Sequence, residues 1–218
     1  MPTKDRFMDL DNGLTEAITA RYAGYLFDGY DAVHWYEREA GAVAALAAHV
    51  GLDPVWLAGL TAALSPVISV RGNALRLLRA IQAWQGGATW EAAVAGLPCT
   101  PGSVKTHALA FLAKGWQGLG PKTGPFGRNL SGQGVHVTVD TWMCQAAGVP
   151  HASVARSSSP ERLACEAACA ALADALDIQP AAAQAAVWYG VRRAKGVKDS
   201  RDSLAEVFAA WMAGTLAL

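Results

Sequence analysis

The glycine-rich stretch 116-WQGLGPKTGPFGRNLSGQGVHVTVDTW-142 is the starting point for the fold. It follows 103-SVKTHALAFLAKG-115, a helix-favouring segment that stops at a glycine, the residue that most often follows a helix end. Gly118 and Gly120 allow a tight turn because glycine adopts positive φ at little cost. Pro121 suits the first turn of a second helix, since its φ is already helical. The stretch therefore predicts two helices joined by a hairpin rather than a flexible linker.

The segments on either side of this hairpin also predict helices. Alanine, the strongest helix former, dominates 41-GAVAALAAHV-50 and 163-LACEAACAALADAL-176. Strand-like alternation is confined to 135–139, which is too short for a sheet. The sequence thus predicts an all-α fold, a two-lobed helical bundle with a helix-hairpin-helix motif, in which 1–218 is a single domain. Within it, the hairpin and the aspartate that follows occupy 103–148, and 1–50 and 150–218 form a supporting helical lobe.

Capping residues mark several expected helix starts. Asp53 and Pro54 precede one helix, Thr89 precedes another, and Ser159 stands before Pro160. Side-chain oxygens of such residues accept hydrogen bonds from the first unpaired amides of a helix, and proline fits its first turn.

Composition narrows the class of protein. With 52% hydrophobic and 17% charged residues, the chain is expected to be globular. It shows no apolar run long enough for a membrane span and no signal-peptide pattern, so a cytoplasmic protein without a membrane partner is expected. The net charge is −3 over residues 1–100 and +3 over 101–218, too mild an asymmetry to indicate or exclude nucleic acid. Cys165 and Cys169 share a helix face, where buried small side chains are favoured over a metal pair.

The hairpin has a chemical use of its own. Unpaired amides and the helix dipole favour an anion at a helix start, and a phosphate fits this description. Such a contact carries no sequence information, which suits a protein that grips the DNA backbone.

Two motifs carry a family resemblance. The hairpin 118-GLGPKT-123 resembles the L-P-G-V-G-R-K-T hairpin of the helix–hairpin–helix DNA glycosylase superfamily, and 137-VTVDTW-142 resembles the V-D-T-H that follows it. Lys122 and Asp140 are 18 residues apart, as in that superfamily. The segment 60-LTAALSPVISVRGNALRLLRAI-81 resembles its early helix pair, so the likeness covers about residues 55–148.

A closer resemblance is to uncharacterised bacteriophage proteins that carry K-x-x-x-F-x-x-N-L, then V-T-[IV]-D, then Q-A-x-x-W. The matching positions are Lys122, Phe126, Asn129, Leu130, Val137, Thr138, Val139, Asp140, Gln184, Ala185 and Trp188.

The resemblance implies roles for individual residues. Asp140 would stabilise the cationic sugar or activate a nucleophile, and Lys122 would be the amine nucleophile of a glycosylase with AP-lyase activity. The target base would have to be flipped out of the stack, with Trp142 and Asn73 in its pocket. Contacts to DNA are expected from Gly118, Gly120, Thr123, Arg128, Asn129, Arg192 and Arg193.

The sequence also departs from the superfamily pattern. Trp142 replaces the usual histidine, and the four-cysteine iron–sulfur loop is absent, so no iron–sulfur cluster, other cofactor or metal is expected. DNA is the expected partner of a monomer. Two alternatives remain: a phage thymine-base hypermodification transferase on the same fold, and a non-catalytic DNA-binding module. Among single residues, Lys122 can be a solvated helix-start lysine or a phosphate contact, and Asp140 a helix cap, a role compatible with catalysis.

Overall fold

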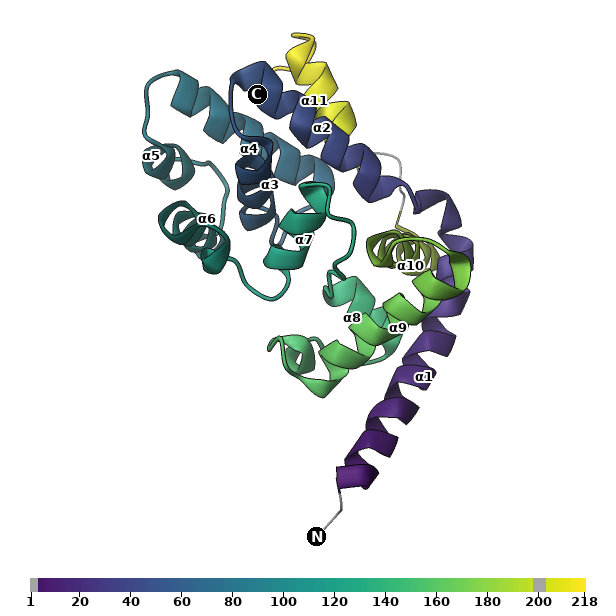
Figure 1. Cartoon of the computed structure of the whole chain (residues 1–218). Coiled ribbons are helices and arrows are strands. Elements are labelled where there is room, and N and C mark those ends of the chain that lie inside the picture. Colours follow the sequence, from purple (N-terminus) through teal and green to yellow (C-terminus); the bar gives the residue numbers. More distant parts are fainter. Residues whose placement is uncertain (1–3, 198–202) are drawn as a thin grey trace. The chain divides into compact units, whose positions relative to one another are not determined.

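The computed structural model describes residues 4–197 and 203–218, with side chains from residue 13 onward. These residues form helices and loops without any strand, which confirms the all-α prediction (Figure 1). The chain divides into two compact units, one formed by Met1–Tyr36 with Gly134–Asp199 and the other by Glu37–Gln133 with Ser200–Leu218. The expected hairpin–aspartate segment 103–148 and the expected supporting lobe are therefore each divided between the units.

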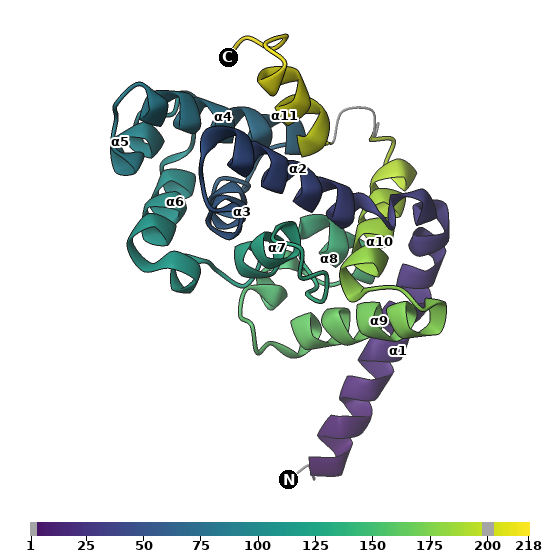
Figure 2. The ribbon, with the colours of Figure 1, turned by 45° about the horizontal axis from the view of Figure 1, so that its top comes forward.

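The first unit is built around a long N-terminal helix. Helix α1 packs against α8, α9 and α10, and α9 and α10 can be followed beside it in Figures 1 and 2. Its elements are α1 (Lys4–Asp28), η1 (Tyr30–Ala32), α8 (Thr141–Ala147), η3 (His151–Val154), α9 (Pro160–Leu176) and α10 (Pro180–Ala194).

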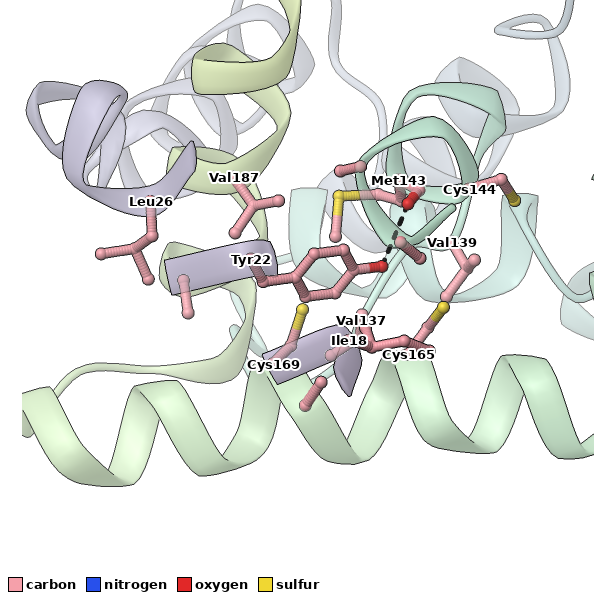
Figure 3. Close-up of a cluster of buried hydrophobic side chains, with 14 of the residues drawn as sticks. Ile18, Tyr22, Leu26, Val137, Val139, Met143, Cys144, Cys165, Cys169 and Val187 are labelled. Carbon is pink, nitrogen blue, oxygen red and sulfur yellow. Dashed lines mark hydrogen bonds between the residues drawn. The ribbon is translucent and has the colours of Figure 1, made fainter. Parts of the chain in front are cut away.

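The core of this unit is lined with small side chains and cysteines around one tyrosine (Figure 3). Tyr22 is fully buried, and its hydroxyl donates to the carbonyl oxygen of Met143 in α8 over 3.1 Å. Cys165 and Cys169, four residues apart on α9, point into the same core, as the sequence predicted. Burial raises the pKa of both thiols.

Thiol reactivity tests this core directly. Cys99 is exposed, whereas Cys144, Cys165 and Cys169 are buried, and burial raises the pKa of Cys144 to about 12. Because the thiolate is the reactive form, we expect a disulfide reagent such as DTNB to modify one thiol of the native protein and four after denaturation. The Cys99→Ser variant should show none when native. Rapid native modification of that variant would contradict the buried core.

The second unit carries the hairpin. Helix α3 packs against α4, α6 and α7, α5 packs against α4 and α6, and α11 packs against α4. The elements are α2 (Trp35–Val50), which begins in the first unit, and α3 (Pro54–Ala63), α4 (Val70–Gln85), α5 (Trp90–Ala95), α6 (Gly102–Lys114), η2 (Gly115–Gly118), α7 (Thr123–Leu130) and α11 (Leu204–Met212).

Most expected helix starts are confirmed, and one cap differs. The Asp53 carboxylate accepts from the Trp56 amide over 2.6 Å, and the Thr89 hydroxyl accepts from the Ala92 amide over 3.2 Å. Ser159 precedes α9, but its hydroxyl donates back to the Arg156 carbonyl oxygen and does not cap the helix.

The hairpin turns differently from the expectation. Gly115 has the positive φ, 57°, and Gly118 and Gly120 do not. Gly118 is needed for a different reason: a Cβ there would overlap the carbonyl group of Ala110 in α6. Helix α7 begins at Thr123 rather than around Pro121, since a short turn intervenes. The hairpin therefore depends on a positive φ at Gly115 and on the close approach of Gly118 to α6, rather than on positive φ at Gly118 and Gly120.

Within the described residues, no single helix is long and apolar enough to cross a membrane. By length and composition, one bent pair of helical segments passes the same test, Tyr30–Val50 with Pro54–Ala63, at a bend of 114°.

Candidate functional site

Asp140 lies in the first unit at the start of α8, and its carboxylate accepts three hydrogen bonds. Its Oδ1 accepts from the backbone amides of Trp142 at 2.9 Å and Met143 at 3.0 Å. Its Oδ2 accepts from the indole Nε1 of Trp188 at 3.0 Å. A carboxylate offers about four acceptor positions, so one position on Oδ2 is left over by the described residues. Three hydrogen bonds hold the carboxylate, and the residue is half-buried.

Alternation along the preceding segment gives Asp140 this position. Val137 and Val139 point into the core of the first unit (Figure 3). Thr138, between them, faces the other way, with its Oγ1 3.2 Å from the Tyr36 hydroxyl oxygen. Asp140 follows two residues later, on the same side as Thr138, since successive side chains of extended backbone alternate in direction.

Helix α10 meets this polar side of the segment. The Tyr36 hydroxyl donates to the Gln184 Oε1 over 2.8 Å, and both side chains are buried. Gln184 and Trp188 are four residues apart and so share a helix face. The Q-A-x-x-W and V-T-V-D positions are therefore partners in space: Gln184 is linked to Thr138 through Tyr36, and Trp188 bonds directly to Asp140.

Two of the three arginines expected at DNA, Arg192 and Arg193, make contacts within the first unit. Arg192 is buried, and its guanidinium carbon lies 4.0 Å from the centroid of the Trp188 ring. Arg193 donates to both carboxylate oxygens of Asp31, at 2.6 and 2.8 Å, and to the carbonyl oxygen of Asp28. The hydrogen bond from Arg193 holds the pKa of Asp31 below its ordinary value. Neither guanidinium is presented as an exposed phosphate contact.

Lys122 lies in the second unit, directly before α7. Its side chain is half-buried, and within residues 4–197 and 203–218 its ammonium group makes no hydrogen bond or ion pair. The Gly120 amide donates to the Thr123 hydroxyl at 2.9 Å, so this amide is used inside the hairpin. Of the expected phosphate-binding groups here, Lys122 and the exposed Arg128 are the cations that the hairpin presents.

The remaining expected residues have different surroundings. Asn129 is only 1% exposed, which places its amide inside the second unit. Asn73 is also buried there and donates to the Thr61 carbonyl oxygen over 3.1 Å, while its Oδ1 has no partner among the described residues. Trp142 is half-buried and belongs to the first unit. The two residues expected in one base pocket thus belong to different units.

Sequence reasoning missed the bond between Asp140 and Trp188 and the neighbouring contacts of Gln184 and Tyr36. Trp188 and Gln184 could have been placed from their four-residue spacing in Q-A-x-x-W, which sets both on one helix face. Tyr36 gave no signal, because it is about a hundred residues distant from the segment that it contacts. In the described part of the chain no cluster of three His, Cys, Asp or Glu side chains could hold a metal ion.

Comparison with known proteins gives a family without an activity. No curated protein and no solved structure matches the chain. Residues 16–195, more than half of the chain, match the model of a family described as a family of unknown function (DUF7178). This range includes both the hairpin and the Asp140–Trp188 contact. The chain belongs to the DUF7178 family.

Proposed function

We propose that this protein is a DNA-acting enzyme of the DNA glycosylase type, which flips a base and acts on its bond to the sugar through Asp140. The observation that carries the proposal is the fixed carboxylate of Asp140. Two backbone amides and one indole N–H donate hydrogen bonds to it, and one acceptor position on Oδ2 is left over. The resemblance of 118-GLGPKT-123 and 137-VTVDTW-142 to the glycosylase motifs supplies the substrate class.

Asp140 is suited to stabilising positive charge on a sugar. As the base leaves with the electron pair of its bond to C1′, positive charge develops on C1′ and the ring oxygen. A carboxylate that is oriented before the reaction stabilises that charge without reorganising, and partial burial strengthens the interaction. The same Oδ2 position can instead accept a proton from an attacking water molecule, which is the second route to base release.

Lys122 is suited to the sugar or to a phosphate. As a nucleophile, its neutral amine forms a bond to C1′ while the base departs with the bonding electrons and takes up a proton. Opening of the sugar ring then gives a Schiff base. As a phosphate contact, its ammonium group adds a cation beside the first amides of α7.

Borohydride trapping on abasic-site DNA separates these roles. Borohydride reduces a Schiff base to a stable amine, so a nucleophilic Lys122 gives a covalent protein–DNA adduct that Lys122→Ala abolishes. Lys114→Ala is the matched control, because Lys114 is an exposed lysine at the end of α6. This variant should retain the adduct. An equal adduct with Lys122→Ala would rule out the nucleophile and leave the phosphate contact, which is then measured as weaker DNA binding.

The reaction itself is tested on a panel of duplexes that carry uracil, 5-hydroxymethyluracil or an activated pyrimidine. Release of a free base supports the glycosylase. A base that is replaced while the strand stays intact would instead assign a base-modifying transferase. Binding of DNA without any base chemistry would assign a non-catalytic module.

A further inference from the structure

We propose that Trp188 is a positioning residue for Asp140 and that Arg192 acts on the carboxylate through the Trp188 ring. This inference rests on the proposed function, because a positioning role has meaning only if Asp140 touches the reacting sugar. The contact that motivates it is the 3.0 Å hydrogen bond from the Trp188 Nε1 to the Asp140 Oδ2.

The cap and Trp188 hold different oxygens of the same carboxylate. The amides of Trp142 and Met143 both bond to Oδ1, and the Trp188 indole N–H bonds to Oδ2. The Cβ–Cγ torsion of an aspartate has a broad preference, and turning about it moves both oxygens, so contacts at both oxygens restrain the torsion more tightly than the cap bonds alone. The Trp188 N–H also occupies one acceptor position of Oδ2, which leaves one other position on that oxygen.

Arg192 places a positive charge over the face of the same indole ring. Its guanidinium carbon lies 4.0 Å from the Trp188 ring centroid, and the side chain is buried. An aromatic ring is negative over its face and positive at its edge, so the cation faces the negative surface while the carboxylate meets the positive N–H edge. Both contacts polarise the indole in the same sense, which strengthens the N–H donor.

A role in packing alone would give the same contacts but different kinetics. The Trp188 ring also packs against two other aromatic rings. Its centroid lies 6.4 Å from that of Trp35 and 5.1 Å from that of Tyr189. If Trp188 only held helices together, its truncation would lower stability and DNA affinity without a selective effect on the chemical step. If it positions Asp140, the loss falls on the rate of that step.

The test uses the full chain and Trp188→Phe, which removes the N–H donor but keeps a ring for Arg192. We expect single-turnover base release on the best duplex of the panel to fall by about ten- to a hundredfold, the scale of a misoriented catalytic group. Affinity for a duplex with a tetrahydrofuran abasic analogue should stay near that of the wild type. Trp84→Phe is the matched control, because Trp84 is half-buried and stacks on Trp90, and should keep the wild-type rate.

An independent measurement follows the hydrogen bond itself. The indole ¹⁵N–¹H resonance of Trp188, assigned by its absence in Trp188→Phe, should lie downfield and move upfield in Asp140→Asn and in Arg192→Met. If the Trp188 resonance does not move in either Asp140→Asn or Arg192→Met, the proposed contact is overturned, whatever rate of base release is measured. A responsive resonance with an unchanged rate in Trp188→Phe would make the contact structural only and so also overturn the inference. If the wild type acts on no duplex, the proposed function fails, and the resonance then reports a hydrogen bond without a catalytic role.

Discussion

Asp140→Asn is expected to lower the rate of base release by at least about a hundredfold, the scale observed when one preorganised electrostatic group is removed from an active site. The substitution takes away the negative charge that faces the developing sugar cation and leaves a side chain of nearly the same shape. Single-turnover release from the duplex panel measures the loss. DNA affinity should change little, because the carboxylate acts on charge that appears only as the base leaves.

The asparagine is chosen because it isolates the charge. Asparagine caps helices as well as aspartate does, and its Oδ1 can still accept from the Trp142 and Met143 amides that Asp140 now binds. Its amide group would oppose the Trp188 N–H, donor against donor, at a cost of about 1–3 kcal/mol. Adding Trp188→Phe should recover that stability without recovering activity.

Asp177→Asn provides the matched control for this substitution. Asp177 is an exposed residue of the same unit, in the left-handed region after α9, where asparagine is well tolerated. Its variant should release base at the wild-type rate. Wild-type release by Asp140→Asn would remove Asp140 from the chemistry, and retained DNA binding alone would favour the non-catalytic module.

The helices were largely predictable from the sequence because their signals are local. Alanine-rich periodicity and capping residues act within one or two turns, so the start of α3 after Asp53 and that of α5 after Thr89 could be assigned residue by residue. Ser159 shows where local reasoning fails: a serine can cap a helix or donate backward, and the loop geometry decides. Two lobes were expected, but the segments that make up each unit were not predictable, since α11 joins the second unit through long-range contacts with α4.

The candidate site was predictable in part for the same reason. The role of Asp140 as the cap of α8 follows from its own neighbours in sequence. Its bond to Trp188 joins residues 48 apart, and the Tyr36–Gln184 bond joins residues 148 apart. Contacts of such separation depend on how helices pack, which periodicity does not encode. The burial of Arg192 was not predictable either. It belongs to a basic cluster at the end of α10, and such clusters are usually exposed to solvent.

Glu39→Ala is expected to destabilise the second unit by about 3 kcal/mol, within the range for breaking a buried, hydrogen-bonded charge. Glu39 in α2 is 0% exposed. Its carboxylate accepts from the Ser203 hydroxyl at 3.0 Å and from the Ala205 amide at 2.8 Å, both at the start of α11. The substitution removes a long-range cap and leaves the buried Ser203 hydroxyl and the half-buried Ala205 amide without this acceptor.

Thermal unfolding and hydrogen exchange measure this effect together. A loss of about 3 kcal/mol corresponds to a fall in Tm of roughly 6–12 °C for a chain of this size, and the amides of α11 should exchange first. Arg38 also donates to Glu39, at 2.9 Å, but its side chain is 55% exposed, so Arg38→Ala should cost less than about 1 kcal/mol.

Glu91→Ala is the matched control, since Glu91 is an exposed glutamate on α5 of the same unit. Its variant should unfold within about 0.5 kcal/mol of the wild type. Equal stability of Glu39→Ala and Glu91→Ala would show that α11 is held by its buried apolar residues Leu204, Val207 and Phe208 alone. A stability loss without a change in the base-release rate of the folded fraction would also separate the anchoring of α11 from the chemistry proposed for Asp140.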